Sequence, residues 1–250
     1  MRPAVEESPS PATADAAAQP PVGYYGKLPA RGDFVTQRLN AGFVAAWDEW
    51  LRAGIVASQS TLGDGWLDAY LAAPIWRFVL PAAAARGVPM IGVVMPSVDR
   101  AGRYFPLTLA APLQGEPTLA LCFTGASWLA ELERVALRAL EDTAGLDGFE
   151  ADVAAISTPP ATPAPVPEPC DDGGLRLALP AGAGDPMAQL AAHAAGNAYA
   201  GQCIFWSLGG ARVAPAALLS PTLPAAARFA EFISDGAGRG PIEDLFGPAP

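Results

Sequence analysis

Residues 90–109 read MIGVVMPSVDRAGRYFPLTL, and this stretch decides the fold. An apolar run, Met90–Met95, and an aromatic and β-branched run, Arg103–Leu109, flank a segment rich in Pro, Ser, Asp and Gly. Short runs of Val, Ile, Tyr, Phe and Thr bounded by turn residues are typical of two strands joined by a loop. The stretch therefore predicts a β-hairpin with a polar loop at its tip.

The hairpin loop is unusual because it carries Asp99, Arg100 and Arg103 beside some of the most apolar sequence in the chain. One interpretation is that the aspartate and an arginine form a local salt bridge that stabilises the hairpin, and the spacing favours it. The other is a functional loop, because loops held by a rigid scaffold often carry function.

Charge and cysteine content exclude several classes of protein. The chain has 250 residues, a net charge of −10 and a pI near 4.5, which argues against binding to nucleic acid or to an anionic membrane surface. Three cysteines at wide spacing, Cys122, Cys170 and Cys203, predict free thiols in a reducing compartment. Neither a secretory signal nor a long apolar segment is present, so we expect a cytoplasmic protein without membrane insertion.

The hydrophobic periodicity predicts several helices. The first, Asn40–Ser58, has Asn40 as its N-cap and an apolar face that includes Trp47 and Trp50, interpreted as core residues rather than a ligand platform. The other expected helices are Asp64–Ala73, capped by Asp64; Ser127–Asp142, capped by Ser127; Asp185 to about Ala195; and Pro224–Ile233. The buried side of the helix from Asp64 is expected to hold Trp66, Leu67, Tyr70 and Leu71, and that of the last helix Ala225, Phe229, Phe232 and Ile233.

Further strands are expected at Tyr24-Tyr25, Ile75–Leu80, Thr118–Phe123 and Leu175–Leu179, and as a hairpin of Gln202–Leu208 with Arg212–Leu219. Arg77 lies inside an apolar run, so it needs a carboxylate or carbonyl partner if it is buried. Pro215 predicts an edge strand or a bulge.

No catalytic motif is present: the chain lacks G-x-S-x-G, a Walker A loop and H-E-x-x-H. The only histidine is His193, and no cysteines have metal-ligand spacing. We therefore predict no catalytic, cofactor-binding or metal-binding residues and no cofactor. The enzymatic alternative is a metal-dependent hydrolase that uses Asp99 or Asp33.

Three motifs carry a family resemblance. Gly26–Phe34 reads GKLPARGDF, Trp47–Leu51 reads WDEWL, and Met95–Leu107 reads MPSVDRAGRYFPL. Together, over roughly Gly23–Asp142, they resemble the TagF (ImpM-type) family of proteins associated with bacterial type VI secretion. The motifs are long and occur in order, which makes chance similarity a poor explanation.

The resemblance implies an α/β fold of the α+β type, with a mainly antiparallel sheet flanked by helices. It also implies a cytoplasmic accessory protein, of a family that in some systems represses secretion post-translationally by acting on a forkhead-associated scaffold protein. Because no catalytic motif is present, we expect this protein to be a non-enzymatic repressor of that kind. Some relatives carry a fused PP2C-type phosphatase domain, so a separate phosphatase of that type is a second expected partner. A structural subunit of the secretion apparatus is a further alternative.

The domain organisation expected from these observations has five parts. They are a disordered segment (1–22), a TagF-like α/β domain (23–150), a Pro/Ala-rich linker or surface loop (151–172), a smaller strand–helix portion packed on the first domain (173–235) and a flexible tail (236–250).

The candidate site residues lie in two charged loops. Either they contact the partner or they brace the loops against each other, and bracing is favoured because Arg–carboxylate pairs beside apolar strands are usually satisfied internally. We expect the loops to be neighbours, with Arg31 or Arg103 within salt-bridge reach of Asp99 or Asp33. The full set is Lys27, Arg31, Asp33, Asp99, Arg100, Arg103 and Tyr104.

Overall fold

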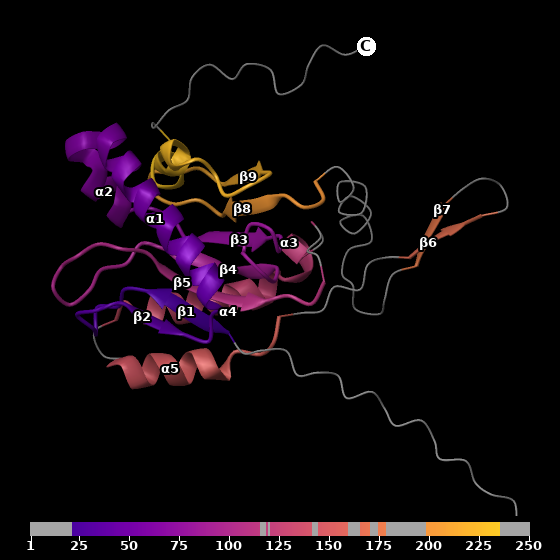
Figure 1. Ribbon diagram of the computed structural model, residues 1–250, viewed down its shortest axis with the longest axis horizontal. Coiled ribbons are helices and arrows are strands. Elements are labelled where there is room, and N and C mark those ends of the chain that lie inside the picture. The colour runs from indigo at the N-terminus through magenta and orange to yellow at the C-terminus, as the bar shows by residue number, and fades with distance from the viewer. Residues whose placement is uncertain are drawn as a thin grey trace, which may run out of the picture.

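A seven-stranded antiparallel sheet in the order β2-β1-β5-β4-β3-β8-β9 organises the molecule (Figure 1). The computed structural model describes residues 22–115, 119, 121–141, 145–159, 166–170, 175–178 and 199–235. The strands of this sheet are β1 (Gly23–Gly26), β2 (Val35–Gln37), β3 (Trp76–Leu80), β4 (Met90–Met95), β5 (Leu107–Pro112), β8 (Cys203–Ser207) and β9 (Ala216–Ser220). With helices on both faces, this is the predicted α+β fold.

The predicted hairpin lies at the centre of this sheet. β4 and β5 pair from Met90 with Pro112 to Met95 with Leu107. Every residue of β4 is buried, which explains its unbroken apolar sequence, because both of its faces are covered. The second arm begins at Leu107 rather than Arg103, because a backbone hydrogen bond from Asp99 N to Arg103 O (3.0 Å) keeps the preceding residues in the loop.

One face of the sheet is covered by α1 (Ala41–Leu62), the short helices η1 (Gly63–Gly65) and α2 (Trp66–Leu71), and η2 (Ala226–Phe232). The Asn40 side chain accepts a hydrogen bond from Gly42 N at 2.7 Å, so Asn40 is the predicted N-cap. Trp47 and Trp50 are 1% and 7% exposed, which confirms that they are core residues.

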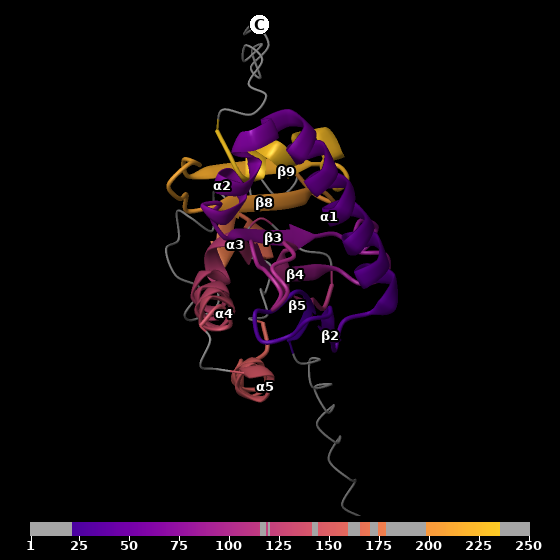
Figure 2. The ribbon, with the colours of Figure 1, turned by 90° about the vertical axis from the view of Figure 1, so that its left-hand side faces the viewer.

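The opposite face is covered by α4 (Ala126–Arg138), with α3 (Leu121–Thr124) and α5 (Gly145–Ala155) beside it. Figure 2 shows α1 and α4 on opposite sides of the sheet. Arg77 of β3 is buried on the α4 side, where its Nε and a terminal nitrogen donate to Glu133 at 2.7 and 3.0 Å. The predicted carboxylate partner of Arg77 is therefore Glu133.

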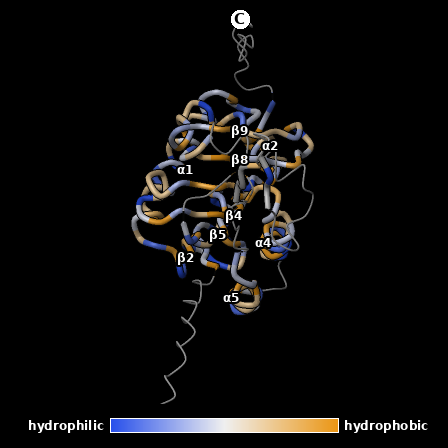
Figure 3. Tube along the Cα trace, turned by 90° about the vertical axis from the view of Figure 1, so that its right-hand side faces the viewer, coloured by the Kyte–Doolittle hydropathy of each residue, from blue (hydrophilic) through white to orange (hydrophobic). Residues whose placement is uncertain are grey.

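Hydropathy follows this layering. Figure 3 shows apolar residues running along the central strands, between the helices on either side. No helix among the described residues combines the length and hydropathy needed to cross a bilayer. Cys122, Cys170 and Cys203 are all free thiols.

Several local expectations were wrong. The predicted strand Thr118–Phe123 is replaced by the helix α3 over its last residues, because β4 and β5 already have β3 and β1 as neighbours and the sheet has no free edge there. Ser127 is not a cap, since Gly125 occupies the N-cap position of α4.

The expected helix Asp64–Ala73 is also shorter than predicted. Asp64 belongs to η1 and does not cap α2, whose N-cap is Gly65. Of the four residues expected on its buried side, Trp66 and Tyr70 are buried, while Leu67 and Leu71 are 37% and 57% exposed because α2 has only six residues. The sequence pattern did not reveal α5 at all.

The C-terminal part of the chain also differs from the sequence prediction. Val166–Pro169, expected as linker, forms β6 and pairs with β7 (Leu175–Ala178) in a separate two-stranded sheet. Each strand of such a pair has a free edge, where proline is tolerated. The last helix is the 3-10 helix η2 rather than an α-helix, and Ala225 is exposed.

The hairpin of β8 and β9 is confirmed, and β9 is an edge strand, as Pro215 predicted. Both strands belong to the same sheet as β1–β5. The boundaries predicted for the five parts of the chain stay a prediction. Val22 is 1% exposed and belongs to the core. Three predictions lie outside the described residues: most of the disordered N-terminal segment, the flexible tail, and the helix that begins at Asp185 and carries His193. They fall at residues 1–21, 236–250 and 185–195.

Candidate functional site

Two charged loops meet at one end of the sheet. The first loop, residues 27–34, connects β1 to β2, and the hairpin loop, residues 96–106, connects β4 to β5. β1 pairs antiparallel with β5, with Tyr25 opposite Thr108, so the end of β1 lies beside the start of β5. Gly26 has φ 140°, and a Cβ there would lie 2.1 Å from the Pro106 carbonyl oxygen. Glycine therefore permits the close approach of the two loops.

Asp99 is the centre of this loop pair. One carboxylate oxygen, Oδ2, accepts from Lys27 Nζ at 2.5 Å and from Arg103 Nε at 2.7 Å. The other, Oδ1, accepts from the backbone N–H groups of Ala101 (2.8 Å) and Arg103 (2.9 Å). The Asp99 side chain is 0% exposed. A carboxylate has about four lone-pair sites, so these four donors leave no free site on Asp99 for a metal ion or a substrate proton.

Opposing effects act on the pKa of Asp99. Burial by itself would raise this pKa, but the hydrogen bonds from Lys27, from the Arg103 side chain and from the two backbone N–H groups outweigh it. The pKa of Asp99 is therefore held well below its usual range, and the group stays ionised at neutral pH.

Further contacts tie the loops together. The Arg103 guanidinium donates to the Gly32 carbonyl oxygen and lies 4.0 Å from the Asp33 carboxylate. Arg100 N donates to Arg31 O at 2.9 Å. The two loops are neighbours, and Arg103 reaches both Asp99 and Asp33, as the sequence predicted.

The predicted residues divide into a buried base and an exposed rim. Lys27 is 5% exposed and Asp99 3%, so these two brace the loops from inside. Arg31, Asp33 and Arg100 are exposed. Arg103 belongs to both the base and the rim, because its Nε donates to Asp99 while its side chain is 59% exposed.

Tyr104, the remaining predicted residue, braces the hairpin loop against α2. Its ring makes edge contacts with Trp66 and Tyr70, with centroids 6.2 and 5.9 Å apart. Tyr104 is half-buried, so its main contacts are internal.

Sequence reasoning missed two polar bracing residues, Ser97 and Tyr70. Ser97 Oγ donates to Lys27 O at 2.7 Å, and the Tyr70 hydroxyl donates to Ser97 O at 3.0 Å. Burial raises the pKa of Tyr70, which keeps this donor protonated. Ser97 lies within the MPSVD motif, so its motif position was an available signal, whereas nothing local links Tyr70 to the loop.

The exposed rim borders a cleft of about 590 Å³. Phe34 is 37% exposed at this cleft. It stacks on Tyr25 with centroids 5.7 Å apart, and Lys27 Nζ lies 4.5 Å from its ring centroid. The residues lining the cleft are Tyr24, Ala30, Arg31, Gly32, Asp33, Phe34, Val35, Thr36, Arg100, Leu146 and Glu150.

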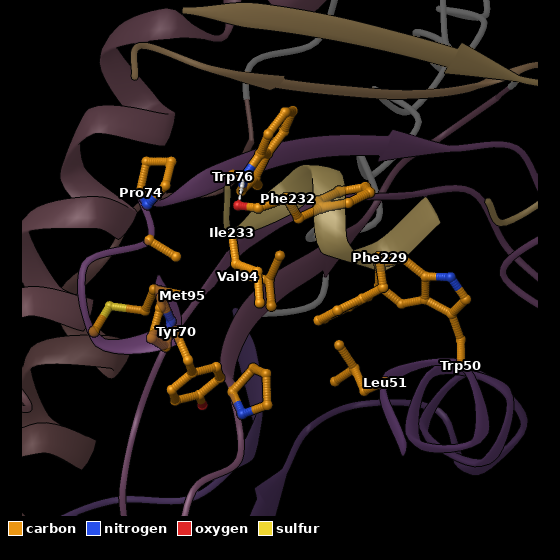
Figure 4. Close-up of a pocket in the computed structure, with 13 residues that line it drawn as sticks. Trp50, Leu51, Tyr70, Pro74, Trp76, Val94, Met95, Phe229, Phe232 and Ile233 are labelled. Atoms are coloured by element: carbon orange, nitrogen blue, oxygen red, sulfur yellow. Dashed lines mark hydrogen bonds between the residues drawn. The ribbon is translucent and has the colours of Figure 1, made fainter. Parts of the chain in front are cut away.

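A second cavity belongs to the core. It measures about 30 Å³ and is lined mainly by aromatic and aliphatic side chains, including Trp50, Phe229 and Phe232 (Figure 4). The Trp76 indole N–H donates to Phe232 O at 2.8 Å at its edge. Drug-sized ligands occupy cavities about ten times larger, so we interpret this space as a packing gap between η2 and the sheet.

No cluster of three or more His, Cys, Asp or Glu side chains suited to a metal ion occurs in the described part of the chain. Asp33 is fully exposed, and its carboxylate lies 4.0 Å from the Arg103 guanidinium. The two acids considered for a hydrolase therefore have different surroundings. Asp99 is saturated by internal hydrogen-bond donors, whereas Asp33 lies at the surface.

Comparison with known proteins points to one family. The model of the TagF N-terminal domain, described as type VI secretion system-associated, matches residues 23–156. The crystal structure of PA0076 from Pseudomonas aeruginosa PAO1 is 39% identical with a TM-score of 0.74, and the match covers 92% of this chain and 100% of that one. No curated protein matches the chain. All three sequence motifs, and therefore the loop pair, fall inside the matched residues.

Proposed function

We propose, from the premise that this chain belongs to the TagF family of type VI secretion-associated proteins, that it is a cytoplasmic, non-enzymatic repressor of secretion-system assembly. It acts by binding a forkhead-associated scaffold protein through the exposed rim of the loop pair. The observation that carries this proposal is the cluster of buried Lys27 and Asp99 with Arg103, in the same two loops that expose Arg31 and Arg100.

The bracing supports a recognition surface. Internal hydrogen bonds to Asp99 hold both loops in one arrangement, so a partner does not have to order them on binding. Exposed arginines beside an aromatic ring are typical of residues that dominate protein interfaces, and Phe34 supplies that ring. Bracing and partner contact are then roles of different residues in one site.

A pull-down with purified scaffold protein tests the binding surface. We expect the Arg100→Glu variant to lose capture of the scaffold, because Arg100 is exposed and makes its contact to the first loop through its backbone N–H. Arg212→Glu is the matched control, since Arg212 is also exposed but precedes β9 at the other edge of the sheet. Circular dichroism verifies folding, and full capture by a folded Arg100→Glu protein would remove Arg100 from the interface.

A secretion assay in the native host tests repression. Deletion of the gene is expected to increase secretion, and wild-type protein but not Arg100→Glu is expected to reverse the increase. Unchanged or reduced secretion on deletion contradicts repression. Stoichiometric co-purification with the membrane complex would instead identify a structural subunit.

Turnover assays with divalent metals address the enzymatic alternative. Because Asp99 is saturated by internal donors, we expect no metal-dependent hydrolysis that depends on it. Activity that is lost in Asp99→Asn, in protein shown to be folded, would overturn the non-enzymatic proposal.

A further inference from the structure

The cleft beside the loop pair has the chemistry of a binding site for an acidic peptide. We infer that the cleft binds an extended acidic segment of the scaffold protein, with a side-chain carboxylate held between Arg31 and Arg100. This inference depends on the proposed function. Three features of the cleft point to this ligand: its local charge, the surroundings of the two guanidinium groups and its shape.

Local charge is opposite to that of the whole protein. The two loops, residues 27–34 and 96–106, contain four cations, Lys27, Arg31, Arg100 and Arg103, and two carboxylates, Asp33 and Asp99, for a formal charge of +2; Glu150 of α5 adds one carboxylate to the lining of the cleft. The whole chain carries −10. The cationic loops attract an acidic segment through complementary charge.

Arg31 and Arg100 are adjacent across the loop pair. Their backbones are joined by the hydrogen bond from Arg100 N to Arg31 O, and both residues are exposed and line the cleft. Within the described residues, the structure pairs neither guanidinium with a carboxylate. An anion bound between these two guanidinium groups would lower the electrostatic repulsion between them. Carboxylate suits this position, because guanidinium binds it with two parallel hydrogen bonds.

The acids of the cleft lie next to donors other than Arg31 and Arg100. Asp33 lies 4.0 Å from the Arg103 guanidinium. Glu150 of α5 accepts a hydrogen bond from the Tyr24 hydroxyl at 2.7 Å. These contacts leave Arg31 and Arg100 as the groups free to bind an incoming carboxylate.

The shape of the cleft suits an extended segment. Its volume of about 590 Å³ exceeds that of a single side chain. Val35 and Thr36 of β2 line it, and β2 is the outermost strand of the sheet. A segment lying there runs beside the edge of β2, where backbone groups are available for strand addition, while Phe34 and Leu146 offer apolar contacts.

Fluorescence anisotropy with a labelled peptide of alternating aspartate and glutamate tests this inference. We expect binding by the full chain that weakens as salt is raised, and no comparable binding of an asparagine–glutamine peptide of equal length. The double variant Arg31→Gln/Arg100→Gln should bind the acidic peptide at least about tenfold more weakly, because two charge-assisted hydrogen bonds are lost.

The matched control is Arg212→Gln/Arg228→Gln, which removes the same charge from exposed residues near the opposite edge of the sheet. It should bind the acidic peptide within about twofold of wild type, since distant exposed charges are screened. Equal binding by both double variants, or equal binding of the uncharged peptide, overturns the inference. So does binding only of a neutral peptide that carries one phosphothreonine, because it assigns the site to phosphate rather than carboxylate.

The two proposals fail in different ways. If Arg100→Glu loses scaffold capture but no acidic peptide binds, the proposed function stands and the acidic-segment inference falls. If the acidic peptide binds at Arg31 and Arg100 but the scaffold protein is not captured, the cleft binds acidic segments and the proposed function falls.

Discussion

At the scale of single residues, Asp99 links two distant segments of the chain, because its ion-pair partner Lys27 lies 72 positions earlier in the sequence. Its carboxylate is buried, ionised and saturated by four donors. Removing the charge leaves Lys27, itself 5% exposed, as a buried cation without its counter-ion, and an uncompensated buried charge is strongly unfavourable. Asp99 therefore determines whether the exposed rim exists as a defined surface.

The lowered pKa of Asp99 predicts a specific pH dependence. Its ordinary value of 3.8 applies to the unfolded chain, so below that pH the unfolded state binds a proton that the folded state does not. The stabilisation from Asp99 is complete above about pH 5 and is lost as pH falls below 3.8 towards the folded pKa. In urea unfolding, the difference between wild type and Asp99→Asn should be largest at pH 7 and should shrink below pH 4.

Asp68→Asn is the control for this prediction, because the Asp68 side chain is 77% exposed and, among the described residues, pairs only with Arg212, itself 48% exposed, at 3.9 Å. Its effect on the urea midpoint should be small at every pH. A difference for Asp99→Asn that stays constant from pH 7 to pH 3 would show that Asp99 does not carry a lowered pKa.

At the scale of elements, the close packing of α1 against η2 decides the effect of a small substitution. Gly54 lies inside α1, where alanine normally stabilises a helix by about 0.5–1 kcal/mol. Here an added Cβ would lie 2.3 Å from the Phe229 ring. Gly54→Ala is therefore expected to destabilise the protein by about 1–3 kcal/mol, the usual cost of overpacking, as measured by urea unfolding.

Two variants show whether Phe229 is responsible. Ala45→Gly, at an exposed position of α1, measures the ordinary glycine penalty of about 1 kcal/mol. Adding Phe229→Ala to Gly54→Ala removes the Cγ and Cδ2 atoms that the new Cβ would meet, so the double variant should lose less than the two single changes together. Stabilisation by Gly54→Ala alone would contradict the packing.

The ion pair between β3 and α4 is a second element-scale contact. The Arg77 side chain is 8% exposed, and Glu133 is its carboxylate partner. Glu133→Ala leaves a buried guanidinium unpaired and should cost about 3 kcal/mol in urea unfolding, the low end for buried pairs because Glu133 is 20% exposed. Glu131→Ala breaks the exposed pair with Arg134 on the same helix and should leave the midpoint nearly unchanged; equal effects would refute the special role of Arg77.

At the scale of the whole molecule, the C-terminal strands complete the sheet that begins with the first loop. β8 pairs with β3, and η2 packs on α1, where the Trp50 indole N–H donates to Pro224 O at 2.8 Å. The residues of the family match, 23–156, contain the whole loop pair but not β8, β9 or η2. The core on the α1 face therefore depends on residues far beyond that match.

A truncation after residue 156 should therefore not fold stably. It exposes the edge of β3 and uncovers the aromatic residues that η2 covers, and both features favour aggregation. Size-exclusion chromatography and thermal unfolding measure this, with the full chain as the reference. A monomeric fragment with a cooperative transition near that of the full chain would show that residues 23–156 fold independently.

The sequence by itself determined the features that local chemistry specifies. Asn40 begins α1, the spacing of Phe43, Trp47 and Trp50 shows its buried face, and the turn residues after Met95 produce the central hairpin. These signals depend on neighbours within a few positions, which act in the same way in most tertiary contexts. The three motifs likewise indicated the family and the charged loops.

Only the tertiary structure decided which distant groups meet. It placed Glu133 beside Arg77 and joined Lys27 to Asp99. It also turned residues 121–124 into a helix, because the strands there had no free edge left to pair. Such outcomes depend on partners and free edges supplied by residues far away in the chain. Local propensity contains no information about them, so packing overrides it where the two disagree.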